Sequence, residues 1–487
     1  MGSNRNYYRR GLSYLKRNGA KATLNKAVER IIRDRTESYY VPEHADEATL
    51  EAQRKHVFER PYRFSILVPV YETDPVLFRA MLDSVGQQTY GNWELILADA
   101  SADESRRNIV RDFIEDHTGP GMDSFGRIRD RVKYVRVSEN NGISANTNEA
   151  LSHATGDYTG LLDHDDILEN TALFDIMSAI ESFEQSGRSS ENITRVMAVY
   201  TDEDKVSEDG SRYFDLHVKP DFDPVLLCTN NYVCHFFVAD TNLAKSVGGF
   251  RTEYDGAQDH DFILRCTEGV RREQILHVPK VLYHWRSTAG STSENPDAKL
   301  YAYEAGRRAV EDHLRRIGVG AKITDSPHLG FFNIEYDRLH RAVKTITPEE
   351  LAQTSGSGKL PSEEYILVLS PGLAPVDGDY IADMMSCMNL PFVGAVTGKI
   401  IGRDQRVESA GFDTDEDGVK VARFSGLFKS FSGYLHRADL DQIVEGFTED
   451  CVLLRREAVE STAPHVTLKD GWDIYYEPKA VFKRKSK

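Results

Sequence analysis

The sequence predicts an α/β protein in which a mainly parallel sheet carries helices on both faces. Strand-like and helix-like segments alternate over residues 63–162, and such alternation is typical of βαβ units. Polar residues follow the strand-like runs, most clearly in LLDHDD at residues 161–166. Because ligands gather outside the carboxyl ends of strands in open α/β sheets, the sequence places a candidate site at that sheet edge.

The predicted elements follow from hydrophobic periodicity and from helix start signals. The first strands and helices are expected in alternation at 63–70, 78–85, 94–98, 108–117, 132–137, 144–154 and 158–162. Later strands are expected at 198–200 and 277–285, and later helices at about 255–266 and at 299–317. The segment TSGSGK, residues 354–359, has the composition of a flexible linker.

Length and composition narrow the class of protein. A chain of 487 residues predicts two or three domains. The net charge of −17 excludes a general nucleic-acid binder, which needs a basic surface. The five cysteines form no C-x-x-C pair, which fits free thiols in a reducing cytosol. Without a secretory leader or a run of about 20 apolar residues, the expected location is cytoplasmic.

Both ends of the chain are basic in an otherwise acidic protein. Residues 4–34 combine arginines and lysines with apolar residues at loosely helical spacing, and residues 479–487 add further lysines. A basic amphipathic helix can lie on an anionic membrane surface, here the inner face of the plasma membrane. It can equally pack against its own domain, and the sequence leaves both alternatives open.

The second half of the chain repeats part of the first half. EYILVL (364–369) matches DYTGLL (157–162), CVLLRR (451–456) matches CHFFVA (234–239), and YEPKAVF (476–482) matches HVPKVLY (277–283). SPG (370–372) replaces the acidic DHD (163–165), so this copy has lost its acids and is expected to be a scaffold or binding domain. The predicted domains are a basic helical extension (1–60), a first α/β domain (61–325) and a degenerate copy (326–487).

The motifs together resemble glycosyltransferase family 2, the inverting enzymes of the GT-A fold. The resemblance rests on SILVPVYE (65–72), LADASAD (97–103), NNGISANTNEAL (140–151), LLDHDDIL (161–168), YTDEDK (200–205), GAQDHDFILR (256–265) and HVPKVLYHWR (277–286). The most similar branch builds bacterial O-antigens, rhamnans and related surface glycans. The resemblance implies a catalytic GT-A domain followed by a partial GT-A-like unit.

The resemblance also implies roles for individual residues. The catalytic base would be Asp259. The ligands of Mn²⁺ or Mg²⁺ would be Asp165, Asp163 and His284, although His284 could equally be a structural ring. The nucleotide-sugar pocket would contain Pro69, Val70, Tyr71, Glu72, Asp99, Asn148, Asp163 and His164. The acceptor would meet Gln258, Trp285 and Arg286. Asp261 would serve the dipole of its helix rather than act as a second base. This chain departs from the family pattern at Ala98 and Gln258, where acids are usual.

The residue chemistry agrees with these implied roles. Neighbouring carboxylates repel one another unless a cation lies between them, and a divalent ion that holds a diphosphate meets that need. Such an ion neutralises charge on a departing nucleoside diphosphate, while a carboxylate within hydrogen-bond reach can accept the proton of an attacking hydroxyl. The expected partners are a UDP- or dTDP-sugar donor, with rhamnose as one candidate sugar, and a glycan or lipid-linked glycan acceptor.

Three other classes of function would require different sequence patterns or compete with this one. A phosphohydrolase with a D-x-D motif would carry it on the first strand, whereas here it follows about the fourth. A nucleotidyltransferase would need a glycine-rich, basic loop after the first strand, and PVYE (69–72) is neither. A non-catalytic glycan-binding or partner-binding protein is the remaining alternative, which the set Asp163, Asp165 and Asp259 disfavours for the first domain.

Overall fold

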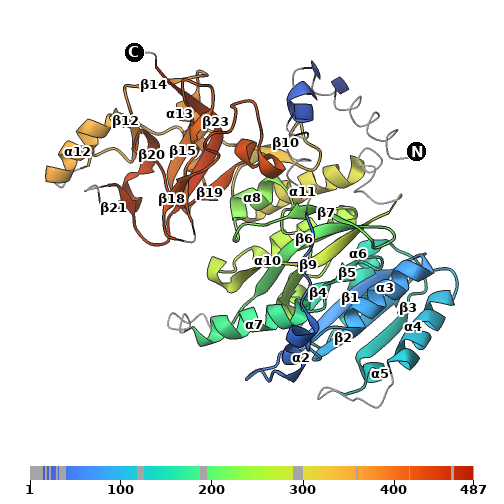
Figure 1. The fold of residues 1–487 in the computed structure, drawn as a ribbon. Coiled ribbons are helices and arrows are strands. Elements are labelled where there is room, and N and C mark those ends of the chain that lie inside the picture. The colour runs from blue at the N-terminus through green and yellow to red at the C-terminus, as the bar shows by residue number, and fades with distance from the viewer. Residues whose placement is uncertain are drawn as a thin grey trace. The chain divides into compact units, whose positions relative to one another are not determined.

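The computed structural model describes residues 15–16, 19–20, 23–28, 31, 40–117, 126–186, 195–288, 300–357, 360–415, 417–461 and 465–485. The chain forms two compact units (Figure 1). One, called here the nine-stranded unit, comprises residues 36–222 and 231–313, and the other, the eight-stranded unit, comprises residues 1–35, 223–230 and 314–487. The predicted domain boundaries lie after residues 60 and 325. The division differs from them because residues 1–35 and 223–230 belong to the same unit as residues 314–487.

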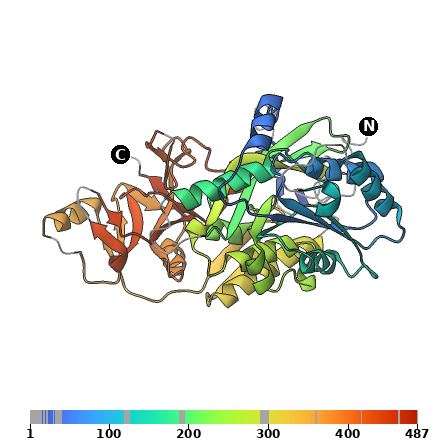
Figure 2. The ribbon, with the colours of Figure 1, turned by 90° about the horizontal axis from the view of Figure 1, so that it is seen from below.

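The sheet of the nine-stranded unit has the order β3-β2-β1-β4-β8-β6-β9-β5, with β7 paired to β6. Its strands are β1 (Phe64–Val70), β2 (Trp93–Asp99), β3 (Val132–Arg136), β4 (Tyr158–Leu161), β5 (Ile167–Leu168), β6 (Ala198–Ser207), β7 (Tyr213–His217), β8 (Phe237–Asp240) and β9 (Ile275–Ser287). Strands β1 to β4 are mutually parallel, and β8 introduces antiparallel pairing. Figures 1 and 2 show the change along the sheet from blue β1 and β2 to green β6.

Helices connect these strands and flank them in the sequence. They are α2 (Glu47–Lys55), α3 (Pro75–Gly86), α4 (Ser105–Asp116), α5 (Ile128–Arg131), α6 (Ile143–Ser152), α7 (Ala172–Gln185), α9 (Thr241–Ser246), α10 (Gln258–Thr267) and α11 (Leu300–Arg316), with short 3₁₀ turns at Thr252–Tyr254 and Arg272–Gln274. The start of α3 illustrates the local cause: Asp74 accepts hydrogen bonds from the backbone of Val76 and Leu77, and Pro75 occupies the first turn.

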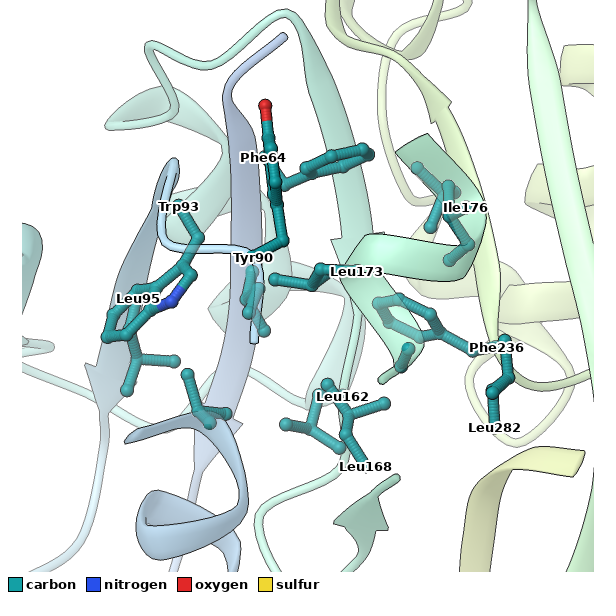
Figure 3. Close-up of a cluster of buried hydrophobic side chains, with 14 of the residues drawn as sticks. Phe64, Tyr90, Trp93, Leu95, Leu162, Leu168, Leu173, Ile176, Phe236 and Leu282 are labelled. Atoms are coloured by element: carbon teal, nitrogen blue, oxygen red, sulfur yellow. The ribbon is translucent and has the colours of Figure 1, made fainter. Parts of the chain in front are cut away.

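The core of the nine-stranded unit lies between the sheet, α3 and α7. Alternate residues of β1 point into it, because side chains of a strand alternate between faces. Figure 3 shows Leu173 of α7 near Phe64 of β1, with Trp93 and Leu95 of β2 on one side of them and Ile176 of α7 on the other. Every residue of β1 and β2 is buried, as expected for central parallel strands. The rigid sheet therefore fixes where β1, β2 and β4 end.

The eight-stranded unit has a sheet of order β12-β13-β20-β15-β23-β14, with β16 paired to β15 and β19 to β23. These strands are β12 (Val343–Ile346), β13 (Tyr365–Leu369), β14 (Leu373–Pro375), β15 (Val393–Ile401), β16 (Val407–Ser409), β19 (Gln442–Val444), β20 (Cys451–Arg455) and β23 (Asp473–Arg484). Two-stranded pairs are β10 (Ala321–Asp325) with β11 (Phe332–Tyr336), β17 (Phe412–Thr414) with β18 (Lys420–Ala422), and β21 (Val459–Ser461) with β22 (Thr467–Leu468). Its helices include α8 (Pro224–Thr229), α12 (Pro348–Ser357) and α13 (Tyr380–Cys387), and 3₁₀ turns lie at Tyr434–Asp439 and Arg456–Ala458.

The strand orders of the two sheets support the internal repeat. The run β4-β8-β6-β9-β5 corresponds to β13-β20-β15-β23-β14. The pairings agree in direction at every step: antiparallel, antiparallel, parallel and antiparallel. A parallel strand, β1 or β12, flanks each run. The three weak sequence matches fall on β4 and β13, β8 and β20, and β9 and β23, so they identify a real structural repeat.

The structure corrects two expectations about local elements and defines a third segment. The strand expected at 198–200 continues to Ser207, so the charged segment 201–205 lies within β6, mostly buried. The expected linker 354–359 is helical as far as Ser357, because α12 continues into it. The basic C-terminal segment is largely strand β23, in which Arg484 pairs with Glu408 and Asp450 at 2.6 Å. Its charges are therefore partly neutralised within the protein.

The basic N-terminal segment 4–34 lies mostly outside the described residues, and residues 23–28 within it are helical. Membrane contact through this segment stays a prediction. Among the residues that the structure describes, no helix has both the length and the apolar character needed to cross a bilayer.

Candidate active site

Three parallel strands bring the predicted nucleotide-binding residues to one edge of the sheet. The register aligns Val70 of β1 with Asp99 of β2, and Leu67 of β1 with Leu161 of β4. Beyond these pairs, the chain continues from β1 into Tyr71 and Glu72, and from β4 into the acidic loop 163–166, called here the DHDD loop. Pro69 and Val70 are buried strand residues, so they support this edge from beneath.

Hydrogen bonds order the residues that follow β1 and β2. Asp99 is fully buried and accepts hydrogen bonds from the Ser101 backbone at 2.8 Å and from the Tyr134 hydroxyl. Glu72 accepts a hydrogen bond from the Ala102 backbone at 2.8 Å, and its own backbone N–H donates to Ser101 Oγ at 3.0 Å. These bonds join the two loops. The Tyr71 ring beside them is about half exposed, at 49%.

Strand β9 holds the DHDD loop from below. The buried Asp166 accepts hydrogen bonds from the Tyr283 hydroxyl and, at 2.7 Å, from the Arg286 backbone. The Arg286 guanidinium donates to the Asp165 carbonyl oxygen at 2.7 Å. Burial and the neighbouring carboxylates of Asp163 and Asp165 raise the pKa of Asp166 well above its usual range. The third acid of the loop is therefore structural, a role that the sequence pattern did not indicate.

Asp163 and Asp165 remain as the metal-binding candidates. Both are partly exposed, whereas Asp166 is buried. Burial raises the pKa of Asp165, and the adjacent Asp163 carboxylate adds to the rise. His164 lies 3.6 Å from Asp165, between Nδ1 and Oδ1. Crowded carboxylate oxygens that disfavour one another's charge are a donor set that suits Mg²⁺ or Mn²⁺, so these residues fit the predicted ion.

The prediction of His284 as the third ligand of that ion is not supported. Its Nδ1 lies 2.6 Å from Asp204 Oδ1, and its Nε2 lies 3.3 Å from Glu169 Oε2. Burial alone would lower its pKa, but the hydrogen bonds to Asp204 and Glu169 raise the pKa of His284 to about 9. Among the described residues, the sets of three potential ligands within 4.8 Å of one another do not include His284 together with Asp163 and Asp165.

The predicted base, Asp259, lies in the first turn of α10. Asn231 Nδ2 donates to its Oδ2 at 2.8 Å, and Cys234 Sγ lies 3.7 Å from the same oxygen. The side chain is partly exposed, so its carboxylate can meet a ligand. Asp261 on the same helix is fully buried and forms ion pairs with Arg251 and Arg265, which makes it a structural residue rather than a second base.

The other predicted contacts divide between available and engaged side chains. Trp285 is partly exposed, with Lys205 Nζ 5.5 Å from its ring centre. Gln258 Oε1 accepts from the Gly256 backbone at 2.8 Å. Arg286 is buried, and besides Asp165 its guanidinium binds the carbonyl of Glu208 at 2.8 Å. An acceptor contact for Arg286 is therefore not supported, because its donors hold the backbone.

Asn148 also serves the protein backbone. Its Nδ2 donates to the Phe250 carbonyl at 2.7 Å, and its Oδ1 accepts from the Phe250 N–H at 2.8 Å. This pair of hydrogen bonds holds the segment before α10 against α6. We therefore assign Asn148 a positioning role in place of the predicted nucleotide contact.

A buried ion network beneath Cys234 was also missed from the sequence. Glu203 of β6 accepts from the His235 backbone at 3.1 Å and lies 3.4 Å from Lys219 Nζ, which donates to the Val233 carbonyl at 2.7 Å. Although burial would raise it, Lys219 and His217 lower the pKa of Glu203 to about 2. The charged motif YTDEDK was the available signal, but nothing in it identified Lys219 as the partner.

The strand order and the acids at its edge define the nine-stranded unit as a GT-A type α/β domain, the fold of nucleotide-diphospho-sugar transferases. Residues 65–187 match the sequence profile described as Glycosyl transferase family 2, and this part of the chain belongs to that family. The predicted fold class and family are thus confirmed, and the chain contains a glycosyltransferase domain.

Two relatives match most of this chain. It is 30% identical over 461 residues to a Sinorhizobium fredii protein described as Uncharacterized protein y4gI, covering 82% of this chain and 48% of that protein. It is 26% identical to the O-antigen biosynthesis protein RfbC of Myxococcus xanthus, covering 82% of this chain and 34% of that protein. The chain therefore spans half or less of the length of these relatives.

Among solved structures, the chain is similar to S. aureus TarS 1-349 in complex with UDP-GlcNAc. The identity is 18%, the match covers 52% of this chain and 66% of that chain, and the TM-score is 0.39.

Proposed function

We propose that the nine-stranded unit transfers a sugar, with inversion of the anomeric carbon, from a nucleotide-sugar donor to a hydroxyl group of a growing bacterial surface polysaccharide. The family match supports the reaction class. The name of the M. xanthus relative, an O-antigen biosynthesis protein, supports a surface-glycan acceptor. The proposed donors are UDP- or dTDP-sugars, and rhamnose is one candidate sugar.

The proposal depends most on the continuity between the acidic loop and the predicted base. Cys234 Sγ lies 3.7 Å from Asp259 Oδ2. Burial raises the pKa of the Cys234 thiol, and the charges of Glu203, Asp259 and Asp163 raise it further. The neighbouring His235 ring stacks on Tyr283 at 4.6 Å, and the Tyr283 hydroxyl lies 3.4 Å from the Asp163 backbone nitrogen. These contacts support the proposal that Asp163 and Asp259 border one site.

The DHDD loop would bind the diphosphate end of the donor. Asp163 and Asp165 would hold Mn²⁺ or Mg²⁺, which, when bound, neutralises charge on the departing nucleoside diphosphate. Tyr283 and Arg286 keep the loop in place through Asp166 and the Asp165 carbonyl. Since these supports are buried, the carboxylates are oriented before the donor arrives, and preorganised charges are effective in catalysis.

Asp259 would remove the proton from the acceptor hydroxyl as that oxygen attacks the anomeric carbon. Asn231 fixes one carboxylate oxygen by its 2.8 Å hydrogen bond, leaving the second oxygen to accept the proton. A base positioned within hydrogen-bond reach contributes about 10²- to 10⁴-fold to a rate. Trp285, partly exposed on β9, would form an apolar wall beside the sugars.

The loops after β1 and β2 would bind the nucleoside. Tyr71 offers a half-exposed ring for contact with the nucleobase of the donor, and the carboxylates of Glu72 and Asp99 lie at the same sheet edge. Because Asp99 is buried and already accepts from Ser101 and Tyr134, we propose that it acts mainly by holding the Tyr134 side of the pocket.

The eight-stranded unit would take no part in donor chemistry. Residues 370–372, serine, proline and glycine, connect β13 to β14 where the DHDD loop connects β4 to β5. Its main sheet, as described, runs from β12 directly to β13 and has no equivalents of β2 and β3. These differences support a role in glycan or partner binding, or as a scaffold.

A thermal-shift panel of nucleotide sugars with and without Mn²⁺ tests the proposal. A ligand that binds only the folded state raises the melting temperature, so one UDP- or dTDP-sugar is expected to stabilise the protein, and more strongly with Mn²⁺. Release of the free nucleoside diphosphate on addition of acceptor glycan would then establish transfer. Absence of stabilisation by every donor, with and without metal, would contradict the proposal.

A further inference from the structure

Three potential metal ligands from distant parts of the sequence meet within the nine-stranded unit. They are His44, which precedes α2, Glu169, which follows β5, and His284 of β9, and their ligand atoms lie within 4.8 Å of one another. Glu169 Oε2 is 2.8 Å from His44 Nδ1 and 3.3 Å from His284 Nε2. The positive charge that faces this shared carboxylate oxygen can come from protons on the two rings or from a bound cation.

The second nitrogen of His284 has a partner that orients the ring. Its Nδ1 lies 2.6 Å from Asp204 Oδ1, and Asp204 Oδ2 accepts from the Tyr40 hydroxyl at 2.8 Å. The His284 and Asp204 side chains are only 2% and 0% exposed. With its Nδ1 proton directed to Asp204, the neutral ring would present Nε2 as a ligand atom on the side of Glu169. Metal-binding histidines usually have this carboxylate support on the far nitrogen.

The spacing suits a tetrahedral ion. Zinc bonds to nitrogen and oxygen of about 2.0–2.1 Å place neighbouring ligand atoms about 3.3 Å apart. The His284–Glu169 separation of 3.3 Å already meets this value. His44 would have to retreat by about half an ångström from its 2.8 Å distance, and its side chain, 49% exposed, has room to do so. Two imidazoles and one carboxylate favour zinc over magnesium.

We propose that His44, Glu169 and His284 form a binding site for a zinc-class transition metal, separate from the acids Asp163 and Asp165. Three protein ligands leave a fourth position on the exposed side of His44. The proposal rests on these contacts and does not depend on the proposed glycosyl transfer.

The position of the site gives it a structural consequence. His284 pairs with Ile167 across β9 and β5. Glu169 follows Asp166 by three residues, and His284 precedes Arg286 by two. A metal there would fasten the segment before α2 to both strands that support the DHDD loop. We therefore expect metal binding to stabilise the fold of the nine-stranded unit.

The test measures metal content in the full chain made without a polyhistidine tag. After treatment with EDTA and dialysis against Zn²⁺, mass spectrometry of metals is expected to find one tightly bound zinc per chain. His44→Ala and Glu169→Gln should each weaken zinc binding by at least about tenfold. Zinc should also raise the melting temperature of the unaltered protein more than that of His44→Ala.

Three matched variants locate the ion. His153→Ala removes another exposed histidine that faces a glutamate, since His153 lies 3.4 Å from Glu149 on α6, and it should leave zinc binding unchanged. Asp165→Asn alters the DHDD loop, and Cys234→Ser alters a second cluster formed by Cys234, His235 and Asp259. Both should retain zinc.

Several results would overturn the proposal. If the unaltered protein bound no zinc, a proton alone would occupy the cluster. Equal affinity in His44→Ala, checked for folding by circular dichroism, would remove His44 as a ligand. Loss of zinc in Asp165→Asn or Cys234→Ser, with retention in His44→Ala, would place the ion elsewhere. None of these measurements uses a sugar donor, so their outcome does not depend on whether the proposed function is correct.

Discussion

The two sheets of this protein share a strand order but differ at one edge. In the nine-stranded unit, β4 leads through the DHDD loop to β5, and β1, β2 and β3 extend the sheet. In the eight-stranded unit, β13 leads through Ser370, Pro371 and Gly372 to β14, and β12 alone extends the sheet. The shared order stabilises each unit, while the chemistry depends on residues at the strand ends, as is general for folds and functions.

The supports of the two loops are similar, although the acids are not shared. Below the DHDD loop, Tyr283 and Arg286 of β9 bind Asp166 and the Asp165 carbonyl. After the equivalent strand β23, Lys485 Nζ donates to the Pro371 carbonyl at 2.7 Å. Glu477 belongs to a separate buried cluster nearer the start of β23, with Cys387 Sγ 3.3 Å from its Oε2. The comparison teaches that the second sheet keeps a basic side chain on the backbone of this loop but has lost the acids.

The largest predicted effect concerns the proposed base. Asp259→Asn keeps the size of the side chain but cannot accept the proton, so we expect transfer to fall by about 10²- to 10⁴-fold while donor affinity is preserved. Rates of nucleoside diphosphate release and donor titrations would measure the two quantities. Asp112→Asn, at an exposed position of α4, should change neither, and undiminished transfer in Asp259→Asn would exclude its role.

The second prediction directly compares the two sheet edges. Asp165→Asn should abolish the metal-dependent part of donor binding, because a neutral amide ligates a divalent cation more weakly than a carboxylate. Ser370→Ala, at the equivalent edge of the eight-stranded unit, should leave donor binding unchanged. Calorimetric titration with Mn²⁺ and with EDTA provides the measurement. Equal loss in both variants would break the assignment of chemistry to one unit.

A smaller effect is expected from the support below the DHDD loop. Tyr283→Phe removes the hydroxyl that donates to buried Asp166, which should destabilise the nine-stranded unit by about 1–3 kcal/mol. Urea unfolding followed by fluorescence would measure the change. Tyr301→Phe, at a position 58% exposed, is the control and should have little effect. A stability change in Tyr283→Phe no larger than in the control would show that the loop does not need this bond.

A further prediction concerns the eight-stranded unit, where the effect depends on pH. Burial, followed by the charge of Asp441, raises the pKa of Glu477 from 4.5 to about 8. The unfolded chain loses this proton at lower pH than the folded chain, so the stabilising contribution is complete below pH 4.5 and is lost as the pH rises to about 8. Glu477→Gln should melt like the unaltered protein at pH 5 and at a higher temperature at pH 8. Identical melting curves at both values would contradict the buried neutral carboxyl.

Much of this architecture was predictable from sequence. Strands β1, β2, β3 and β4 and the helices between them follow from apolar runs and capping residues such as Asp74. The acids after the apolar run of β4 predicted the DHDD loop as a candidate site, and the family resemblance added Asp259 as the candidate base. The repeat was detectable from three weak matches only because they occur in the same order on corresponding strands.

The remaining features depend on contacts between distant residues. A histidine after an apolar strand could serve the donor metal, but Asp204 and Glu169 engage both nitrogens of His284. Similarly, the buried Arg286 side chain donates to the carbonyl groups of Asp165 and Glu208, and no local sequence pattern predicts these contacts. The expected strand ended before the charged run 201–205, yet this run lies within β6 and its charges have buried partners.

A crystal structure of the protein with Mn²⁺ and UDP or dTDP would test the central claim most directly. The account predicts the ion against Asp163 and Asp165, with the diphosphate between the end of β4 and the first turn of α10. A nucleotide bound only at the β13 edge of the eight-stranded unit, or a metal and diphosphate remote from both acids, would contradict it.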